Sequence, residues 1–243
     1  MGKTLIFTAT YNERENVEDL INQINYNSPQ SDILVIDDNS PDGTSELLIK
    51  LKDQKNNLII KVRNGKEGLD TAHKMAYQYA IDNNYDNLIT MDADLSHDPK
   101  ELIKIEKLLI DYPFVIGSRY LTGGKNKMSI LRFLLSYVGN KFIRFALRVN
   151  STEFTNSYRG FNLQKLKDFH LNKINSKGYS FFMETIFLIN KMKFEIKEIP
   201  IIFEIRKSGE SKIPKIETIR TLFNVIRLYL NKWKYFSLLY LII

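Results

Sequence analysis

Short apolar runs alternate with amphipathic stretches along the first 118 residues of the chain. The apolar runs are continuous, which is typical of strands that are buried on both faces. They lie at residues 5–7, 33–36, 58–62, 88–91 and 114–116. The stretches between them repeat apolar residues at steps of three and four, as at 16–25, 71–81 and 99–110, and this spacing predicts helices. The pattern therefore predicts the α/β class, with a mainly parallel, Rossmann-like central sheet and helices on both faces.

This alternation ends after residue 118. We expect a hairpin or loop at 120–125, a long basic helix at 128–148, further helices at 163–169 and 181–191, and strands at 194–199 and 201–205. From Ile213 apolar residues again recur at helical steps, which predicts a C-terminal amphipathic helix. The apolar end at 236–243 has eight residues, whereas a membrane span needs about 20. The chain is therefore expected to comprise a main domain, 1–212, and an amphipathic, apolar C-terminal segment, 213–243.

Basic residues are concentrated in the second half of the chain. The 35 Lys and Arg residues exceed the 28 Asp and Glu residues by 7. Residues 112–152 carry seven bases and no acid, and residues 191–243 carry eleven bases and five acids. This asymmetry indicates an anionic partner for the second half: phosphate groups, a membrane surface or nucleic acid. The absence of cysteine excludes disulfides, thiolate metal sites and a cysteine nucleophile.

Acidic residues follow three of the predicted strands, at Tyr11–Glu13, Asp37–Asp38 and Asp92–Asp94. Ligands bind at the carboxyl ends of the strands of an open parallel sheet, so three acidic ends at one edge favour a bound cation or a ligand rich in donors. Carboxylates two residues apart at a strand end suit Mg²⁺ or Mn²⁺, which also binds substrate phosphates. The alternative is a solvated turn that caps the next helix, a role expected of Asp98.

Four basic residues are candidates for phosphate contacts. Arg119 directly follows a predicted strand, and Arg132 lies on the long basic helix. Arg206 and Lys212 bracket a loop with Gly209 at its centre, which could close over a diphosphate. Arginine offers bidentate contacts to phosphate, and lysine offers a point charge. Neither G-x-G-x-x-G nor G-x-x-x-x-G-K-[ST] occurs, which removes the main support for dinucleotide or P-loop binding.

Several motifs of this sequence occur together, and in this order, in one known family. They are Tyr11–Asn16, Asp37–Thr44, Asp92–His97, Gly117–Tyr120 and the stretch from Ile199 through Arg206 to Lys212. With them the chain resembles the dolichyl- or polyprenyl-phosphate mannose synthases, a branch of the family 2 inverting glycosyltransferases with the GT-A fold. The resemblance extends from about residue 4 to residue 215. Ala9, Asp70, Glu153 and Phe182 depart from the pattern of the family.

The resemblance implies roles for individual residues. Contacts with the nucleotide sugar are implied for Ala9, Tyr11, Glu13, Ile36, Asp38, Asp92, Ala93, Asp94, Arg119, Arg206 and Lys212. A Mg²⁺ or Mn²⁺ ion would be held by Asp92, Asp94 and Ser96, and the acceptor phosphate would be faced by Arg132 and Ser136. Catalysis is expected to depend on Asp92, Asp94, Arg119, Arg206 and Lys212.

The activity that the resemblance implies is transfer of mannose from GDP-mannose to dolichyl or polyprenyl phosphate, with inversion. The acceptor phosphate is already an anion at neutral pH, so this reaction needs no general base. The expected place is the cytoplasmic face of a membrane, with peripheral attachment through residues 213–243. A membrane-anchoring partner, or membrane spans beyond Ile243, would be compatible with this arrangement, and no nucleic acid is expected as a partner.

Other functions remain open from the sequence alone. A family 2 enzyme could use another sugar nucleotide, such as UDP-glucose, or another acceptor; a hydroxyl acceptor would need a carboxylate base. A sugar nucleotidyltransferase is disfavoured because its glycine-rich phosphate loop is missing. A basic peripheral membrane-binding protein without enzymatic activity would explain the charge but not the acidic strand ends.

Overall fold

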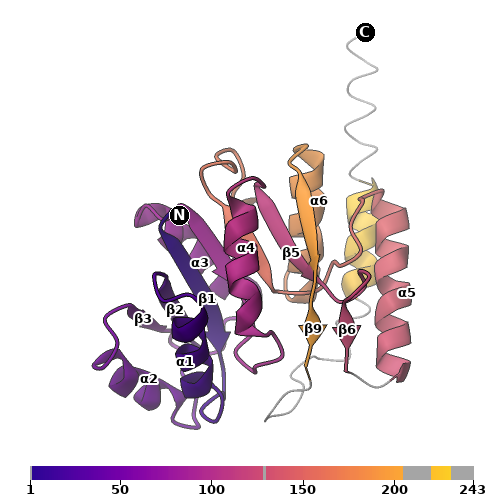
Figure 1. The fold of residues 1–243 in the computed structure, drawn as a ribbon. Coiled ribbons are helices and arrows are strands. Elements are labelled where there is room, and N and C mark those ends of the chain that lie inside the picture. The colour runs from indigo at the N-terminus through magenta and orange to yellow at the C-terminus, as the bar shows by residue number, and fades with distance from the viewer. Residues whose placement is uncertain (1, 128–129, 205–219, 231–243) are drawn as a thin grey trace.

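A seven-stranded sheet forms the centre of the molecule (Figure 1). The computed structural model describes residues 2–127, 130–204 and 220–230, without the side chains of residues 131 and 132. The strand order of the sheet is β3-β2-β1-β4-β7-β5-β8. The strands are β1 (Thr4–Thr10), β2 (Asp32–Asp37), β3 (Leu58–Val62), β4 (Asn87–Thr90), β5 (Phe114–Ser118), β7 (Arg159–Asn162) and β8 (Ile196–Pro200). All neighbours are parallel except β7, which is antiparallel to both β4 and β5.

Helices cover both faces of the sheet, as the sequence predicts. One face carries α1 (Val17–Asn27), α2 (Thr44–Lys52) and α4 (Leu102–Leu109), and the other carries α3 (Leu69–Asp82) and α6 (Tyr179–Lys191). Alternate residues of a strand point to opposite faces. In β1, Leu5 and Phe7 join one buried cluster, whereas Ile6 joins the other. This burial on both sides explains the continuous apolar runs of the strands.

Two further helices lie beside the end of the sheet that holds β8. Helix α5 (Ile130–Leu147) and the helix over residues 220–230 contribute Ile143, Leu147, Val225 and Leu228 to one buried cluster. Arg227 secures the second helix, because its guanidinium lies 2.6 Å from the Glu184 carboxylate of α6. A short parallel pair, β6 (Lys125–Asn126) and β9 (Ile202–Phe203), lies beside them.

The prediction of a helix at 163–169 is wrong. Residues 163–168 instead form turns, which precede the short 3-10 helix η2 (Leu171–Lys173). Leu166 and Phe169 are still buried, so the apolar spacing is satisfied without a helix. The side chain of Asn162 fixes the first turn by accepting a hydrogen bond from the backbone N–H of Lys165.

The sequence pattern does not predict strand β7 (Arg159–Asn162). The expected helix at 99–110 begins as the 3-10 helix η1 (Pro99–Glu101), with Asp98 capping it through the N–H of Lys100.

The C-terminal amphipathic helix is confirmed over residues 220–230. The remainder of the segment 213–243 and the predicted loop 206–212 lie outside the described residues.

Gly160 of β7 lets α4 pack directly on the sheet backbone. A methyl group at this position would come within 2.6 Å of Ile105 and 3.0 Å of Leu109. We therefore expect Gly160→Ala to lower the free energy of unfolding by about 1–3 kcal/mol through overpacking. In Gly65→Ala no heavy atom lies within 4 Å of the new methyl group, so its stability should match the wild type or exceed it slightly. Urea denaturation measures both variants, and equal midpoints would contradict this packing argument.

Candidate functional site

The acidic residues predicted from the sequence gather at one edge of the sheet. Strands β2, β1 and β4 are parallel neighbours, so the loops that follow them emerge at the same edge. The first two loops are joined directly: the N–H of Asn12 donates to Ser40 at 2.9 Å, and the N–H of Glu13 donates to Thr44 at 3.1 Å. The predicted placement of these loops is therefore confirmed.

Asp37 is buried and stabilises the loop after β2. Its carboxylate accepts hydrogen bonds from the hydroxyls of Thr10 at 2.7 Å, Ser40 at 2.6 Å and Ser45 at 2.5 Å. It also accepts the backbone N–H of Ser40. These contacts occupy both carboxylate oxygens, which favours a structural role for Asp37.

Asp38 instead pairs with Arg63, which follows β3. The Nε of Arg63 donates to Asp38 at 2.5 Å, and its Nη1 donates to Thr71. Burial raises the pKa of Asp38 above its ordinary value, although Arg63 acts in the opposite direction. A nucleotide that reaches Asp38 would therefore meet a carboxylate already joined to a guanidinium.

The remaining residues predicted to contact the nucleotide lie near these loops. Ile36 and Ala9 are strand residues of β2 and β1 and pack in the same cluster, Ile36 fully buried and Ala9 partly buried. Tyr11 lies in the loop after β1, where the ammonium of Lys66 is 4.5 Å from its ring centroid.

Both carboxylates of the Asp92–Asp94 turn are anchored by serine hydroxyls. Asp92 accepts from Ser157 at 2.6 Å, and Asp94 accepts the hydroxyl of Ser96 at 2.5 Å and its N–H at 3.0 Å. Ala93, between them, is buried. The side chain of Asp92 is 35% exposed, whereas Asp94 as a residue is 4% exposed. The two carboxylates therefore differ in their access to a ligand.

The carboxylates of this turn fit a divalent cation whose remaining coordination positions are filled by the substrate. Within the described residues no three His, Cys, Asp or Glu side chains form a complete metal site. Mg²⁺ is commonly held by one or two carboxylates, with substrate phosphates and water filling the other positions. Asp92 and Asp94 match that pattern, and oxygen ligands also suit Mn²⁺.

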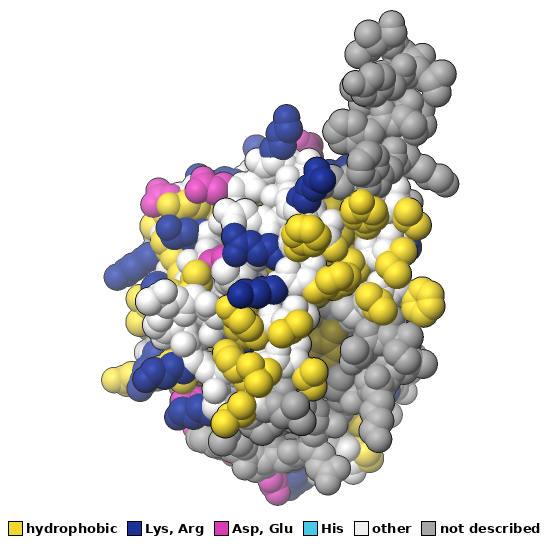
Figure 2. All heavy atoms as spheres, turned by 90° about the vertical axis from the view of Figure 1, so that its right-hand side faces the viewer, with side chains coloured by type: hydrophobic (Ala, Val, Ile, Leu, Met, Phe, Trp, Pro, Cys, Tyr) yellow, Lys and Arg dark blue, Asp and Glu magenta, His cyan; other side chains and the backbone are white. Residues whose placement is uncertain are grey.

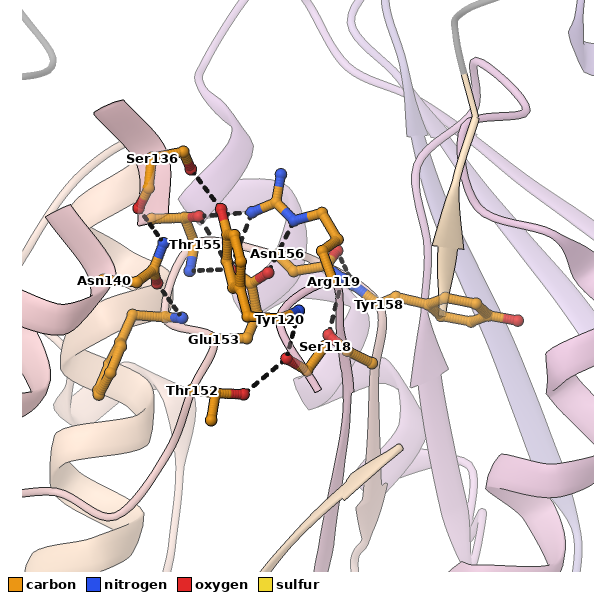
Figure 3. Close-up of polar contacts among 12 residues, drawn as sticks. Ser118, Arg119, Tyr120, Ser136, Asn140, Thr152, Glu153, Thr155, Asn156 and Tyr158 are labelled. Atoms are coloured by element: carbon orange, nitrogen blue, oxygen red, sulfur yellow. Dashed lines mark hydrogen bonds and ion pairs between the residues drawn. The ribbon is translucent and has the colours of Figure 1, made fainter. Parts of the chain in front are cut away.

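Arg119 and Glu153 form a buried bidentate ion pair (Figure 3). The Nε of Arg119 donates to Glu153 at 2.7 Å and its Nη2 donates at 2.9 Å, while Thr155 accepts a further bond from Nη2 at 3.0 Å. Burial lowers the pKa of Arg119, but Glu153, with smaller contributions from Tyr120 and Asp92, raises it, and the net shift is upward, so the guanidinium stays charged. Burial raises the pKa of Glu153, yet Arg119 brings it below its ordinary value.

This pair leaves one nitrogen of Arg119 available. Its hydrogen bonds to described residues use Nε and Nη2, and Nη1 has no partner among them. The guanidinium carbon lies 5.1 Å from the ring centroid of Phe203 and 5.3 Å from that of Tyr120. Hydrogen bonds and ring contacts thus fix the position of the side chain, and Nη1 is the nitrogen that can still donate to a ligand.

Helix α5 is joined to the same site through Ser136. Its hydroxyl lies 2.6 Å from that of Tyr120, and its carbonyl accepts from Asn140, which in turn accepts the N–H of Phe154 (Figure 3). Arg132 precedes Ser136 by four residues in α5, which places both on one side of the helix. Arg206 and Lys212 lie outside the described residues, so their predicted contacts stay predictions.

Sequence reasoning missed several residues that support the site. Ser157 holds Asp92, Arg63 pairs with Asp38, and Glu198 accepts the N–H groups of Thr152 and Glu153 at 2.8 and 3.2 Å. Only Glu153 carries a signal in the sequence, because it departs from the pattern of the family. The others approach from distant parts of the chain, without a local pattern.

Two other departures have structural explanations. Asp70 accepts the N–H of Gly178 at 3.1 Å, which joins the start of α3 to the start of α6. Phe182 lies in a buried aromatic cluster, edge to face with His73 at 5.0 Å. Burial lowers the pKa of His73 to about 3, so its ring is neutral in this cluster. Both residues therefore serve packing between α3 and α6.

The chain is similar in sequence to known proteins over most of its length. Residues 5–170 match the model of the family described as Glycosyl transferase family 2. The chain is 34% identical over 212 residues to the undecaprenyl-phosphate mannosyltransferase of Micrococcus luteus, with 87% of each chain covered. It is 33% identical over 226 residues to the polyprenol monophosphomannose synthase of Mycolicibacterium smegmatis, with 92% of this chain and 85% of that protein covered.

Solved structures share the fold at lower identity. One is glucosyl-3-phosphoglycerate synthase from Mycobacterium tuberculosis with Mn²⁺, UDP and glucosyl-3-phosphoglycerate (TM-score 0.64, 14% identity, 95% of this chain and 79% of that one). Another is a mannosyltransferase from Pyrobaculum calidifontis with GDP-Man and Mn²⁺ (TM-score 0.57, 15% identity, 86% of this chain and 58% of that one). These likenesses confirm the expected GT-A-like fold. The family match over residues 5–170, together with the two relatives at 33–34% identity, establishes that the chain belongs to glycosyl transferase family 2.

Proposed function

We propose that the chain transfers mannose from GDP-mannose to the phosphate of a polyprenyl or dolichyl phosphate, with inversion at the anomeric carbon. The observation that carries this proposal is the anchored Asp92–Asp94 turn, which shares one edge of the sheet with Arg119. Carboxylates suit the metal of a nucleotide diphosphate, and arginine suits phosphate oxygens. Relatives at 33–34% identity are named for mannosyl transfer to polyprenyl phosphates.

Asp92 and Asp94 would hold Mg²⁺ or Mn²⁺ at the donor diphosphate, with Ser96 beside them. The bound ion would supply charge neutralisation as the diphosphate departs. The hydroxyls of Ser96 and Ser157 orient the two carboxylates, so little reorganisation is needed when the donor binds. The acceptor phosphate is an anion and attacks without a general base.

Arg119 would contact phosphate through Nη1. Glu153 holds the other side of the guanidinium, which fixes the direction in which Nη1 points. Arg132 and Ser136 would face the acceptor phosphate, and Arg206 and Lys212 would contact the donor diphosphate. Such positive groups are needed because donor and acceptor are both anions and repel each other.

We also propose peripheral attachment to the cytoplasmic face of a membrane, because the acceptor lipid stays in the bilayer. None of the helices in the described ranges is long and apolar enough to cross a membrane. Helix α5, however, exposes an apolar stripe, and Figure 2 shows yellow side chains gathered on this face of the molecule beside Lys and Arg. The stripe consists of Ile130, Leu134, Leu135, Val138, Phe142 and Phe145, of which Phe145 is 84% exposed.

Residues 220–230 extend this apolar surface. Leu222, Phe223 and Ile226 are exposed there, while Val225 and Leu228 face the core. An amphipathic helix with exposed apolar and basic residues is suited to the interface of an anionic bilayer. The C-terminal segment 213–243 would then add to a docking surface that α5 already begins, and a membrane-anchoring partner would be compatible with it.

The donor and the metal are tested together in a transfer assay. Purified protein is incubated with polyprenyl phosphate and either GDP-mannose or UDP-glucose, with Mg²⁺ or Mn²⁺, and the lipid product is extracted. We expect transfer of mannose, loss of transfer in excess chelator, and a fall of several orders of magnitude in Asp94→Asn. Asp42→Asn is the matched control, because Asp42 lies at the same edge and accepts backbone N–H groups, from Thr44 in its own turn and from Arg14 in the loop after β1. Transfer of glucose alone, or full activity in chelator, would contradict the proposal.

Glu153 should be essential to the stability of the site. Glu153→Gln leaves Arg119 as a buried cation without its counter-charge, so we expect a loss of about 3–5 kcal/mol in the free energy of unfolding. Glu204→Gln breaks the exposed pair with Lys127 and should cost less than about 1 kcal/mol. In the wild type, the contribution of Glu153 is complete above the ordinary pKa of glutamate and disappears as the pH falls through its lowered pKa. Denaturation at pH 7 compares the variants, and equal losses would contradict the assignment.

The exposed stripe of α5 should bind membranes. Leu135→Glu and Phe145→Glu place a charge where an apolar group would enter the bilayer, so we expect each to reduce flotation with anionic liposomes about tenfold or more. Tyr26→Glu on α1 changes an equally exposed aromatic residue away from the stripe and should float like the wild type. Equal flotation of all these proteins would contradict membrane docking through α5.

A further inference from the structure

His97 is fully buried beside the Asp92–Asp94 turn. Its ring stacks on Tyr158 with the ring centroids 4.9 Å apart and the planes at 25°. Phe203 of β9 also contacts the ring in an edge-to-face arrangement, with the centroids 5.4 Å apart and the planes at 71°. The ring therefore fills a closed aromatic space between the loop after β4, the start of β7 and β9.

The two ring nitrogens of His97 have different surroundings. Nδ1 accepts the backbone N–H of Asp92 at 3.0 Å, so the neutral ring carries its hydrogen on Nε2. Nε2 is buried and has no hydrogen-bond partner among the described residues. A buried polar group without a partner costs about 1–3 kcal/mol. Phenylalanine would fill the same space without that cost but would leave the Asp92 N–H without its acceptor, so the histidine serves the backbone of Asp92 as well as the packing.

A second contact joins the same turn to β9. The carbonyl of Ser96 accepts the N–H of Glu204 at 3.0 Å, and His97 and Phe203 form an isolated antiparallel bridge. The ring of Phe203 also lies 5.1 Å from the guanidinium carbon of Arg119. His97 thus contacts the Asp92–Asp94 turn and also Phe203 of β9, the residue whose ring packs against Arg119.

We propose that His97 is a positioning residue that holds the backbone of Asp92, and through it the Asp92–Asp94 pair, in the geometry that binds a divalent cation with the nucleotide diphosphate. The proposal rests on the proposed function, since the cation and the diphosphate belong to it. His97 touches neither of them and acts through the Asp92 N–H and through its packing against Phe203.

Two variants separate the hydrogen bond from the packing. His97→Phe keeps the aromatic ring and loses the acceptor, whereas His97→Asn keeps an acceptor near the position of Nδ1 and loses the ring. The measurements are Mn²⁺ binding in the presence of GDP, followed by electron paramagnetic resonance, and the thermal unfolding midpoint. His170→Phe is the matched control, because His170 also accepts a backbone N–H at Nδ1, from Asn172 at η2, away from the site.

We expect His97→Phe to bind Mn²⁺ 10–100-fold more weakly at a melting temperature close to that of the wild type, because the loss of the unpaired Nε2 offsets the loss of the acceptor for the Asp92 N–H. His97→Asn should melt at a lower temperature but retain more of the Mn²⁺ affinity, and His170→Phe should bind Mn²⁺ like the wild type. Wild-type affinity in His97→Phe would overturn the role of His97 while leaving the proposed function intact. A wild-type protein that binds no Mn²⁺ with GDP would overturn both.

Discussion

The direction of the strands around β4 determines where the chemistry of this molecule can occur. Strands β1, β2 and β4 run in parallel, so the loops after them share one edge of the sheet. Strand β7 runs in the opposite direction between β4 and β5, so the residues before it arrive at that same edge. Ser157 thereby reaches Asp92, and Glu153 reaches Arg119. One reversed strand therefore completes a site that the parallel strands begin.

Buried polar groups keep this arrangement in place. Arg159, at the start of β7, is 1% exposed and donates to the carbonyls of Asn156, Phe182 and Phe154 at 2.7, 2.8 and 3.2 Å. Burial lowers the pKa of Arg159 to about 9, although the charge of Glu153 acts in the opposite direction, so the guanidinium is still charged at neutral pH. Because two of these carbonyls belong to the loop that carries Glu153, Arg159 fixes the backbone from which Glu153 holds Arg119.

The parallel part of the fold could be predicted from the sequence because continuous apolar strands and amphipathic helices are local patterns. The acidic edge could be predicted for the same reason, since the carboxylates lie at the ends of their strands or within a few residues of them. Strand β7 has no such pattern: it contains Arg159 and Gly160, and its pairing depends on neighbours far away in the chain. The partners of Asp92 and Arg119 therefore could not be predicted. Residues 163–169 have apolar residues at helical spacing although residues 163–168 form turns, because Leu166 and Phe169 are buried without a helix.

The role that we propose for the Asp92–Asp94 turn is to hold the metal of a nucleotide diphosphate. A crystal structure with Mn²⁺ and GDP, with the metal located by its anomalous scattering, tests it directly. We expect a Mn²⁺ peak within roughly 2.5 Å of a carboxylate oxygen of Asp92 or Asp94 and of an oxygen of the diphosphate. A metal bound to the diphosphate at a distance from both carboxylates, or a diphosphate at another edge of the sheet, would contradict it.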